Sequence, residues 1–197
     1  VASHASEEVS GSRATVDASL RDIRELAVGV ASMEQQIAAL REALIHVAHV
    51  PELGTIEEGD IFMTSDPYSV AGAISHANDW LMLMPVFKDG RLIAWSAMFG
   101  HMTDIGGKVP GSLPTDARQI YEEGVVVPPI KIYRKGELQE DVLKVILHNC
   151  RLPMWNLSDF NAIVAALRTA GIRCTELSTR FGDDVFYSAM DEMLERN

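Results

Sequence analysis

The chain has 197 residues, of which 47% are apolar and 23% are charged. This composition is typical of a globular protein with a sizeable core and excludes a largely disordered chain. The formal net charge of −11, with no basic stripe to offset it, argues against nucleic-acid binding. The longest apolar run, residues 80–87, is far shorter than the roughly 20 residues of a membrane helix, so we expect no membrane association.

The two cysteines, Cys150 and Cys174, form no C-x-x-C motif and no disulfide framework. They predict ordinary buried thiols in a reducing compartment, the cytoplasm. The chain begins at Val1 with no signal peptide and ends in a helical pattern, so we expect it to be part of a longer polypeptide. Residues 1–30 are interpreted as an N-terminal lead-in and residues 31–197 as one domain.

The first marked element is a helix from Ser32, where Ser32 and Gln35 form a capping-box pattern. Its apolar residues recur at helical spacing: Met33, Ile37, Leu40, Leu44 and Val47. Pro51 and Gly54 end it, and a short strand is expected at residues 61–63.

A β-hairpin is the most informative local prediction. Two apolar runs, residues 80–87 and 92–99, flank an Asp89-Gly90 pair, which favours a two-residue type I′ turn. If Lys88 faces Arg91, then Asp79 faces Gly100 and Asn78 faces His101. The open end of the hairpin therefore brings Asp79 and His101 together.

The rest of the chain predicts a loop, a strand and several helices. Residues 106–112 are too rich in Gly and Pro for a regular element. The other predicted elements are a helix at 115–123, an edge strand at 125–133, helices at 139–149 and 158–181, the latter capped by Ser158 or Asp159 and ended by Gly182, and a last helix from Asp183-Asp184. The expected fold class is α+β, with a mixed, largely antiparallel sheet covered by C-terminal helices.

Two H-x-x-D segments, residues 76–79 and 101–104, carry the candidate chemistry. Two imidazoles and a carboxylate suit a divalent Mn, Fe or Zn ion and leave coordination positions free. The hairpin register favours this interpretation because it places Asp79 beside His101 without adjustment. The alternative is a simple imidazole–carboxylate hydrogen bond at each strand end, with no metal.

Other motifs are weaker candidates. The Gly106-Gly107-Lys108 segment lacks the G-x-x-x-x-G-K-[ST] spacing of a phosphate loop. Three further histidines, His46, His49 and His148, lie near predicted helix ends, where they satisfy terminal carbonyls. Glu122 and Glu123 are interpreted as decorating the short helix, although a buried carboxyl there could act as an acid or base.

Four segments together resemble the hydantoinase B / oxoprolinase family: GDIFMTSDPY (59–68), SHAND (75–79), GHMTDIGGKVPGSLPTDARQIYEEGVVVPPIKIY (100–133) and GELQEDVLKVILHNCRLP (136–153). The resemblance covers roughly residues 55–195. It implies that residues 31–197 form a hydantoinase B-like catalytic domain within a longer subunit.

The resemblance also implies the site residues. The family's metal ligands fall on His76, Asp79 and His101. Asp104 would orient His101, and both would be catalytic. The remaining site positions are those of the expected substrate loop: Asp66, Tyr68, Gly106 and Gly107.

The implied activity is ATP-dependent hydrolysis of a cyclic amide. A hydantoinase A-like partner subunit would phosphorylate the substrate with ATP, and this chain would complete the reaction at a divalent metal. The alternatives are a subunit of an acetone or acetophenone carboxylase, and a non-catalytic scaffold that docks a kinase-like subunit. Either enzyme would be a hetero-oligomer.

Overall fold

The computed structural model describes residues 38, 53–70 and 72–196. In these residues a five-stranded antiparallel sheet has the order β3-β2-β1-β4-β5, which confirms the predicted α+β class. The strands are β1 (Ile61–Thr64), β2 (Asp79–Lys88), β3 (Arg91–His101), β4 (Ile130–Arg134) and β5 (Glu137–Leu138). The helices are the 3₁₀ turns η2 (Pro67–Val70) and η3 (Ile120–Glu122), and α2 (Glu140–His148), α3 (Pro153–Phe181) and α4 (Asp183–Arg196).

The sheet is buried on both faces in its centre. Alternate side chains of a strand point to opposite faces, so Ile61 and Met63 pack on the side of α3 while Phe62 packs on the other side. The first core also includes Trp80 and Phe160, both fully buried. Burial on both sides explains why the β2 segment has a continuous apolar sequence instead of an alternating one.

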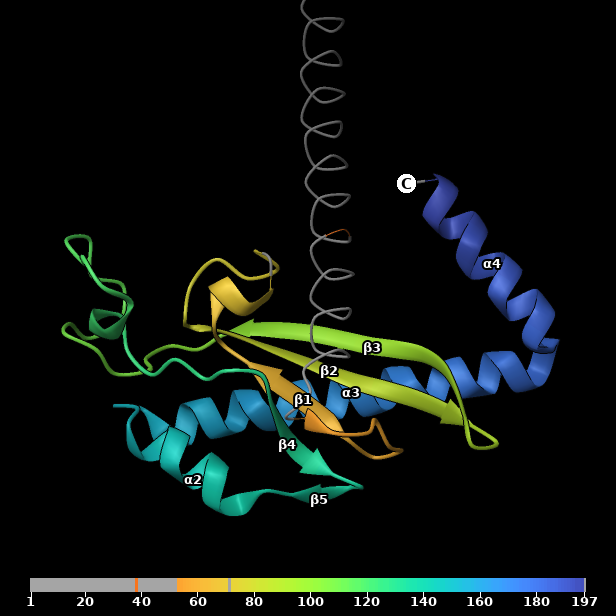
Figure 1. The fold of residues 1–197 in the computed structure, drawn as a ribbon, viewed down its shortest axis with the longest axis horizontal. Coiled ribbons are helices and arrows are strands. Elements are labelled where there is room, and N and C mark those ends of the chain that lie inside the picture. The colour runs from red at the N-terminus through yellow and green to blue at the C-terminus, as the bar shows by residue number, and fades with distance from the viewer. Residues whose placement is uncertain (1–37, 39–52, 71, 197) are drawn as a thin grey trace, which may run out of the picture.

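Helix α3 is the main cover of one sheet face, and α4 turns away from its C-terminal end (Figure 1). Two glycines permit the close approach of α3. A Cβ at Gly100 would lie 2.8 Å from Ile163 Cδ1, and one at Gly171 would lie 2.7 Å from Met84 Cε. No helix in the described parts of the chain is both long and apolar enough to cross a membrane.

The predicted hairpin is present, but its register differs by one residue. Asp89 and Gly90 both have positive φ, 51° and 74°, as a type I′ turn requires. Lys88 pairs with Arg91, and a bulge between Val86 and Phe87 then shifts the pairing. Asp79 therefore pairs with His101, not with Gly100, and the expected pairing of Asn78 with His101 is wrong.

The segment between β3 and β4 contains less regular structure than predicted. Of the expected helix at 115–123, only η3 forms, and the backbone N–H of Arg118 bonds the Glu122 carboxylate. The expected strand at 125–133 begins only at Ile130, since Pro128 and Pro129 have no N–H for a ladder. It is also not an edge strand, because β4 lies between β1 and β5.

The C-terminal helices follow the prediction, except at one start. Helix α2 and the break at Gly182, whose φ is 87°, are confirmed. Helix α3 begins at Pro153, so the expected caps Ser158 and Asp159 are wrong; proline suits the first turn, where an N–H would lack a partner. The predicted helix from Ser32, including His46 and His49, lies outside the described residues apart from Ala38, which is helical.

Candidate metal centre

The three predicted ligands come from two adjacent segments at one end of the hairpin. His76 lies in the turn that precedes β2, Asp79 is the first residue of β2, and His101 is the last residue of β3. Asp79 and His101 are direct partners in the β-ladder. The bulge farther along the hairpin fixes this pairing, so the sequence positions a carboxylate and an imidazole side by side.

The ligand atoms of the three side chains converge. His76 Nδ1 lies 2.9 Å from Asp79 Oδ2, and His101 Nδ1 lies 2.8 Å from Asp79 Oδ1. One ligand atom from each residue can be chosen so that all three lie within 4.8 Å of one another. The two imidazole rings are nearly perpendicular, with centroids 5.3 Å apart. The carboxylate thus lies between two imidazoles.

Asp79 is the buried and oriented member of this cluster. Its side chain is 7% exposed, and its Oδ2 accepts weak hydrogen bonds from the backbone N–H groups of Ser75 and His76, at 3.3 and 3.4 Å. Burial acts to raise the pKa of Asp79, but the hydrogen bond from His101, the charge of His76 and the Ser75 N–H together lower it. The carboxylate is therefore ionised at neutral pH.

The donor set fits a divalent cation. The His76 and His101 side chains are 43% and 45% exposed, so the cluster is closed on the Asp79 side and open to solvent on the imidazole side. Two imidazole nitrogens and a carboxylate oxygen suit Mn, Fe or Zn. The same contacts also satisfy the metal-free alternative, in which each imidazole N–H donates a hydrogen bond to the Asp79 carboxylate.

The Asp104 carboxylate binds the glycine-rich loop and does not contact His101 through a hydrogen bond among the described residues. Its buried carboxylate accepts hydrogen bonds from the backbone N–H of Gly106 at 2.8 Å and of Gly111 at 2.7 Å. Burial acts to raise the pKa of Asp104, but the Gly111 and Gly106 N–H groups and Arg151 lower it. Among the described residues its carboxylate has no hydrogen bond to His101, so the contacts do not support the expectation that Asp104 orients this imidazole.

The glycine-rich loop is built around that carboxylate. Gly106 and Gly107 have φ values of 94° and 78°. A Cβ at Gly106 would lie 2.6 Å from the Asn149 carbonyl oxygen, and one at Gly107 would lie 2.5 Å from that of Glu122, so both positions need glycine. Because Asp104 already accepts hydrogen bonds from the N–H groups of Gly106 and Gly111, these two groups are not available to an anion.

The other two expected substrate residues lie just after β1. The Asp66 carboxylate accepts a hydrogen bond from the backbone N–H of Tyr68 at 3.0 Å, which shapes the start of η2. The Tyr68 side chain is exposed. Figure 1 shows η2 and the segment with η3 at the end of the sheet where β3 ends. Their role in substrate binding stays a prediction.

The remaining candidates have ordinary environments. Glu122 pairs with Lys108 at 2.6 Å, and the hydrogen bond from Lys108 is the main cause of its lowered pKa. This pairing makes Glu122 a poor proton donor at neutral pH. Cys150 is buried as expected, whereas Cys174 is only half-buried. Burial raises the pKa of both thiols, which is typical of unreactive cysteines.

Two polar residues near the site were missed by the sequence analysis. Asn78 is fully buried within the first H-x-x-D segment and bonds Met102 in the second, and Arg151 binds the loop that contains Asp104. Asn78 stands directly before Asp79, but nothing local marks an asparagine as buried. Arg151 lies far from the loop in sequence, and its only signal is a lone charge between two helices.

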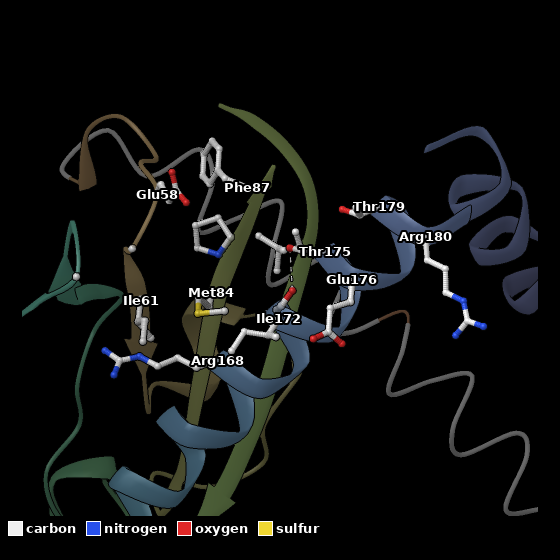
Figure 2. Close-up of a pocket in the computed structure, with 15 residues that line it drawn as sticks. Glu58, Ile61, Met84, Phe87, Arg168, Ile172, Thr175, Glu176, Thr179 and Arg180 are labelled. Carbon is white, nitrogen blue, oxygen red and sulfur yellow. Dashed lines mark hydrogen bonds between the residues drawn. The ribbon is translucent and has the colours of Figure 1, made fainter. Parts of the chain in front are cut away.

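A second concave region lies at the other end of the sheet. This groove, of about 850 Å³, runs between α3 and the strands β1 and β2, and its lining is largely apolar. Figure 2 shows Met84 and Ile172 between the sheet and the helix, with Arg168 reaching toward Ile61. Arg168 stacks over the Tyr133 ring at 5.0 Å. The groove lacks a group of metal-ligating side chains among the described residues.

The comparison with protein families identifies the chain. Residues 18–197 match the family described as Hydantoinase B/oxoprolinase. The chain belongs to this family. The resemblance predicted from the sequence segments is therefore confirmed.

Two of the similar proteins represent the two enzyme classes that the family resemblance implies. The match to the beta subunit of caprolactamase from Pseudomonas jessenii is 37% identical over 138 residues and covers 70% of this chain and 23% of that protein. The match to the delta subunit of acetophenone carboxylase from Aromatoleum aromaticum is 32% identical over 141 residues and covers 71% of this chain and 20% of that protein. The chain thus spans about a quarter or less of these relatives.

Two solved structures match the fold of this chain. The fold matches the ATP-dependent caprolactamase of Pseudomonas jessenii with a TM-score of 0.70 and 36% identity, over 78% of this chain and 26% of that one. It also matches nucleotide-free acetone carboxylase with a TM-score of 0.67 over 77% of this chain and 19% of that one. At 22% identity, the second match shows the shared fold alone.

Proposed function

We propose that this chain forms the metal-binding part of a catalytic subunit in an ATP-dependent hydrolase of cyclic amides. The observation that carries the proposal is the convergence of His76, Asp79 and His101 at the end of one hairpin. The similarity to the beta subunit of a caprolactamase and to the B component of a putative D-/L-hydantoinase supports the substrate class. We expect Mn, Fe or Zn at this site.

The three side chains have distinct roles in this proposal. Asp79, ionised and held by backbone N–H groups, supplies the negative charge that offsets a divalent cation. His76 and His101 supply neutral nitrogens, and their exposed edges leave room for a substrate oxygen. When bound, the metal would act as a Lewis acid on a carbonyl or phosphoryl oxygen.

The proposal includes a partner that uses ATP. The chain has no G-x-x-x-x-G-K-[ST] sequence, and Asp104 accepts the N–H groups of Gly106 and Gly111 in its glycine-rich loop. The similar proteins from Pseudomonas and Aromatoleum are named as subunits, which supports a hetero-oligomer with a hydantoinase A-like, ATP-binding subunit. The free cysteines Cys150 and Cys174 support a cytoplasmic location.

Metal analysis tests the proposal. The purified full-length protein is expected to contain stoichiometric Mn, Fe or Zn, and His76→Ala and His101→Ala are expected to lose it. His148→Ala is the matched control, because this histidine lies in the last turn of α2 and is not a member of the cluster. Protein that contains no metal, with activity unchanged in the two site variants, would favour the scaffold alternative instead.

A carboxylase is the second candidate, favoured by the 32% identity to the acetophenone carboxylase delta subunit. Both reactions would use two histidines and an aspartate, so the site does not separate them. The complete assembly should be incubated with ATP and either hydantoin or a ketone plus bicarbonate. Ring opening with ADP formation supports the hydrolase, and bicarbonate-dependent consumption of the ketone supports the carboxylase.

A further inference from the structure

Arg151 lies between α2 and α3 and binds the glycine-rich loop at several points. Its Nη1 donates to both carboxylate oxygens of Asp104, at 3.1 and 3.2 Å, and to the carbonyl oxygens of Gly106 at 2.9 Å and Val109 at 3.0 Å. Its Nη2 donates to the carbonyl oxygen of Gly107. One guanidinium therefore holds both sides of the loop.

Two further contacts fix the centre of this loop. The Asn156 Nδ2 of α3, which is fully buried, donates to the Asp104 carbonyl oxygen at 2.8 Å. The Ser112 hydroxyl donates to the Gly106 carbonyl oxygen at 2.6 Å and accepts from the backbone N–H of Ile105 at 2.8 Å. The loop is thus bound to the helical layer and closed on itself.

Asn78 connects the loop to the candidate metal centre. The backbone N–H of Met102 donates to the Asn78 carbonyl oxygen at 2.8 Å, and Asn78 Nδ2 donates back to the Met102 carbonyl oxygen at 2.9 Å. The same Nδ2 reaches the Gly111 carbonyl oxygen at 3.4 Å. Asn78 precedes Asp79 and Met102 follows His101, so these hydrogen bonds join the loop to the backbone next to two of the candidate ligands.

We propose that Arg151 is a positioning residue, which holds the loop 104–112 and, through Gly111 and Asn78, fixes the two H-x-x-D segments relative to each other. The connection runs through direct contacts from Arg151 to Asp104, from Asp104 to Gly111 and from Gly111 to Asn78. A role of Arg151 in catalysis rests on the proposed function. The mechanical part of the proposal, that Arg151 positions the two H-x-x-D segments, does not depend on a bound metal.

The chemistry of the contacts requires arginine. The planar guanidinium places Nη1 against the Asp104 carboxylate and Nη2 against the Gly107 carbonyl oxygen at once, whereas the single nitrogen of lysine can occupy only one of these two positions. The positive charge also balances Asp104, whose side chain is only 4% exposed. Arg151→Lys is therefore expected to keep the charge but lose part of the clamp, and Arg151→Met to lose both.

Amide hydrogen exchange of the full-length, metal-free protein tests the mechanical part. Arg151→Met is expected to speed exchange at least about tenfold in residues 102–112 and also in residues 75–79, with a smaller change in Arg151→Lys. The matched control is Arg173→Met, which removes an exposed arginine that pairs with Glu176 on α3. Exchange in β1 and in the buried part of α3 is expected to stay as in the wild type.

Two exchange results would overturn the inference. If residues 102–112 exchange faster while residues 75–79 do not, Arg151 holds the loop without positioning the site. If exchange rises throughout the sheet and α3, Arg151 has a general structural role. The conservative Arg151→Lys variant keeps the test valid if Arg151→Met does not fold.

Metal binding provides the second readout. If the wild type binds Mn²⁺, Arg151→Met is expected to bind it about 10–100-fold more weakly, the range for lost outer contacts, and to change the visible spectrum of the Co²⁺-substituted protein. Unchanged affinity and spectrum would contradict the inference. If the wild type binds no metal, the proposed function fails, and the exchange data alone decide whether Arg151 positions the two segments.

Discussion

The two ends of β1 lie near two buried carboxylates with very different surroundings. At one end, Asp60 contacts Lys131 Nζ at 2.6 Å, and the two side chains are 1% and 5% exposed. At the other end, Asp79 contacts His76 and His101, which are nearly half exposed. Strand pairing explains the placement, because β1 runs antiparallel to β2 and Thr64 pairs with Leu81, close to Asp79.

The two carboxylates differ in solvent exposure of their partners, and this difference suits one end of the sheet to stabilise the fold and the other to bind a cation. The Asp60 pair is closed: its oxygens also accept the backbone N–H groups of Glu57 and Lys135, both at 3.0 Å, and Lys131 donates to the Thr55 carbonyl oxygen. The Asp79 cluster instead has partners that can release a proton and an open side. A closed ion pair can only hold the fold, whereas an open one can exchange its protons for a cation.

The largest expected effect on stability is at the closed end. Asp60→Asn leaves Lys131 charged and buried without its partner, so we expect the free energy of unfolding to fall by about 3–5 kcal/mol. Urea denaturation of the wild type and variant measures this. As a control, Lys131→Met combined with Asp60→Asn is expected to recover a large part of the loss. A loss below about 1 kcal/mol in Asp60→Asn would show that the pair is not closed.

The open end is expected to respond through metal binding instead. Asp79→Asn removes the negative charge of the cluster, and we expect Mn²⁺ affinity to fall about 100-fold or more, since even the loss of an outer partner costs 10–100-fold. Calorimetric titration of the full-length protein measures the affinity. Asp183→Asn, at the junction of α3 and α4, is the control and is expected to bind as the wild type does. Equal binding by Asp79→Asn would exclude this carboxylate as a ligand.

The pH dependence of the free energy of unfolding gives a second test of the Asp60–Lys131 pair. Burial acts to raise the pKa of Asp60, but the hydrogen bond from Lys131 and the N–H groups of Lys135 and Glu57 together lower it. The unfolded state therefore binds more protons near pH 4, and the stabilisation by Asp60 is complete above the unfolded pKa of about 3.9. It is lost as pH falls through the lower folded pKa.

Urea denaturation at several pH values measures this effect. We expect the difference in unfolding free energy between wild type and Asp60→Asn to be constant above about pH 5. Below the unfolded pKa it should shrink by up to about 1.4 kcal/mol per pH unit, the limit for one proton. A difference that grew on acidification would reverse the sign and show that the folded-state pKa is raised.

Local sequence signals predicted most of the fold. The hairpin followed from Asp89-Gly90 between two apolar runs, and the C-terminal helices followed from their apolar spacing. The errors came from effects without a local signal. The bulge between Val86 and Phe87 shifted the register by one residue, and a single 3₁₀ turn formed where a helix was expected, in a segment where Glu122 contacts Lys108.

The candidate site was predicted only in part, because local sequence signals mark some of its residues and not others. The H-x-x-D segments and the hairpin gave His76, Asp79 and His101, because strand pairing brings their positions together. The sequence could not show that the Asp104 carboxylate also binds Arg151, which α2 and α3 bring to the loop. Contacts between segments far apart in sequence have no periodicity to reveal them.

The smallest expected effect tests whether the backbone keeps the Asp60 end closed. Gly59 and Gly136 flank the pair, have φ values of 85° and 86°, and are joined by a hydrogen bond from Gly136 N–H to the Gly59 carbonyl. A Cβ at Gly59 would lie 2.6 Å from the Gly136 nitrogen, whereas one at Gly136 would meet no atom within 4 Å. Gly136→Ala therefore adds only the strain of a positive φ, about 1 kcal/mol.

Gly59→Ala adds the same strain and a collision with backbone that cannot move aside. We expect it to lower the free energy of unfolding by at least about 1 kcal/mol more than Gly136→Ala does. Because the two alanines share their backbone strain, the difference between their urea midpoints measures the packing alone. Equal midpoints would mean that the Gly59 and Gly136 segments can separate, and that the Asp60–Lys131 pair is less closed than its contacts indicate.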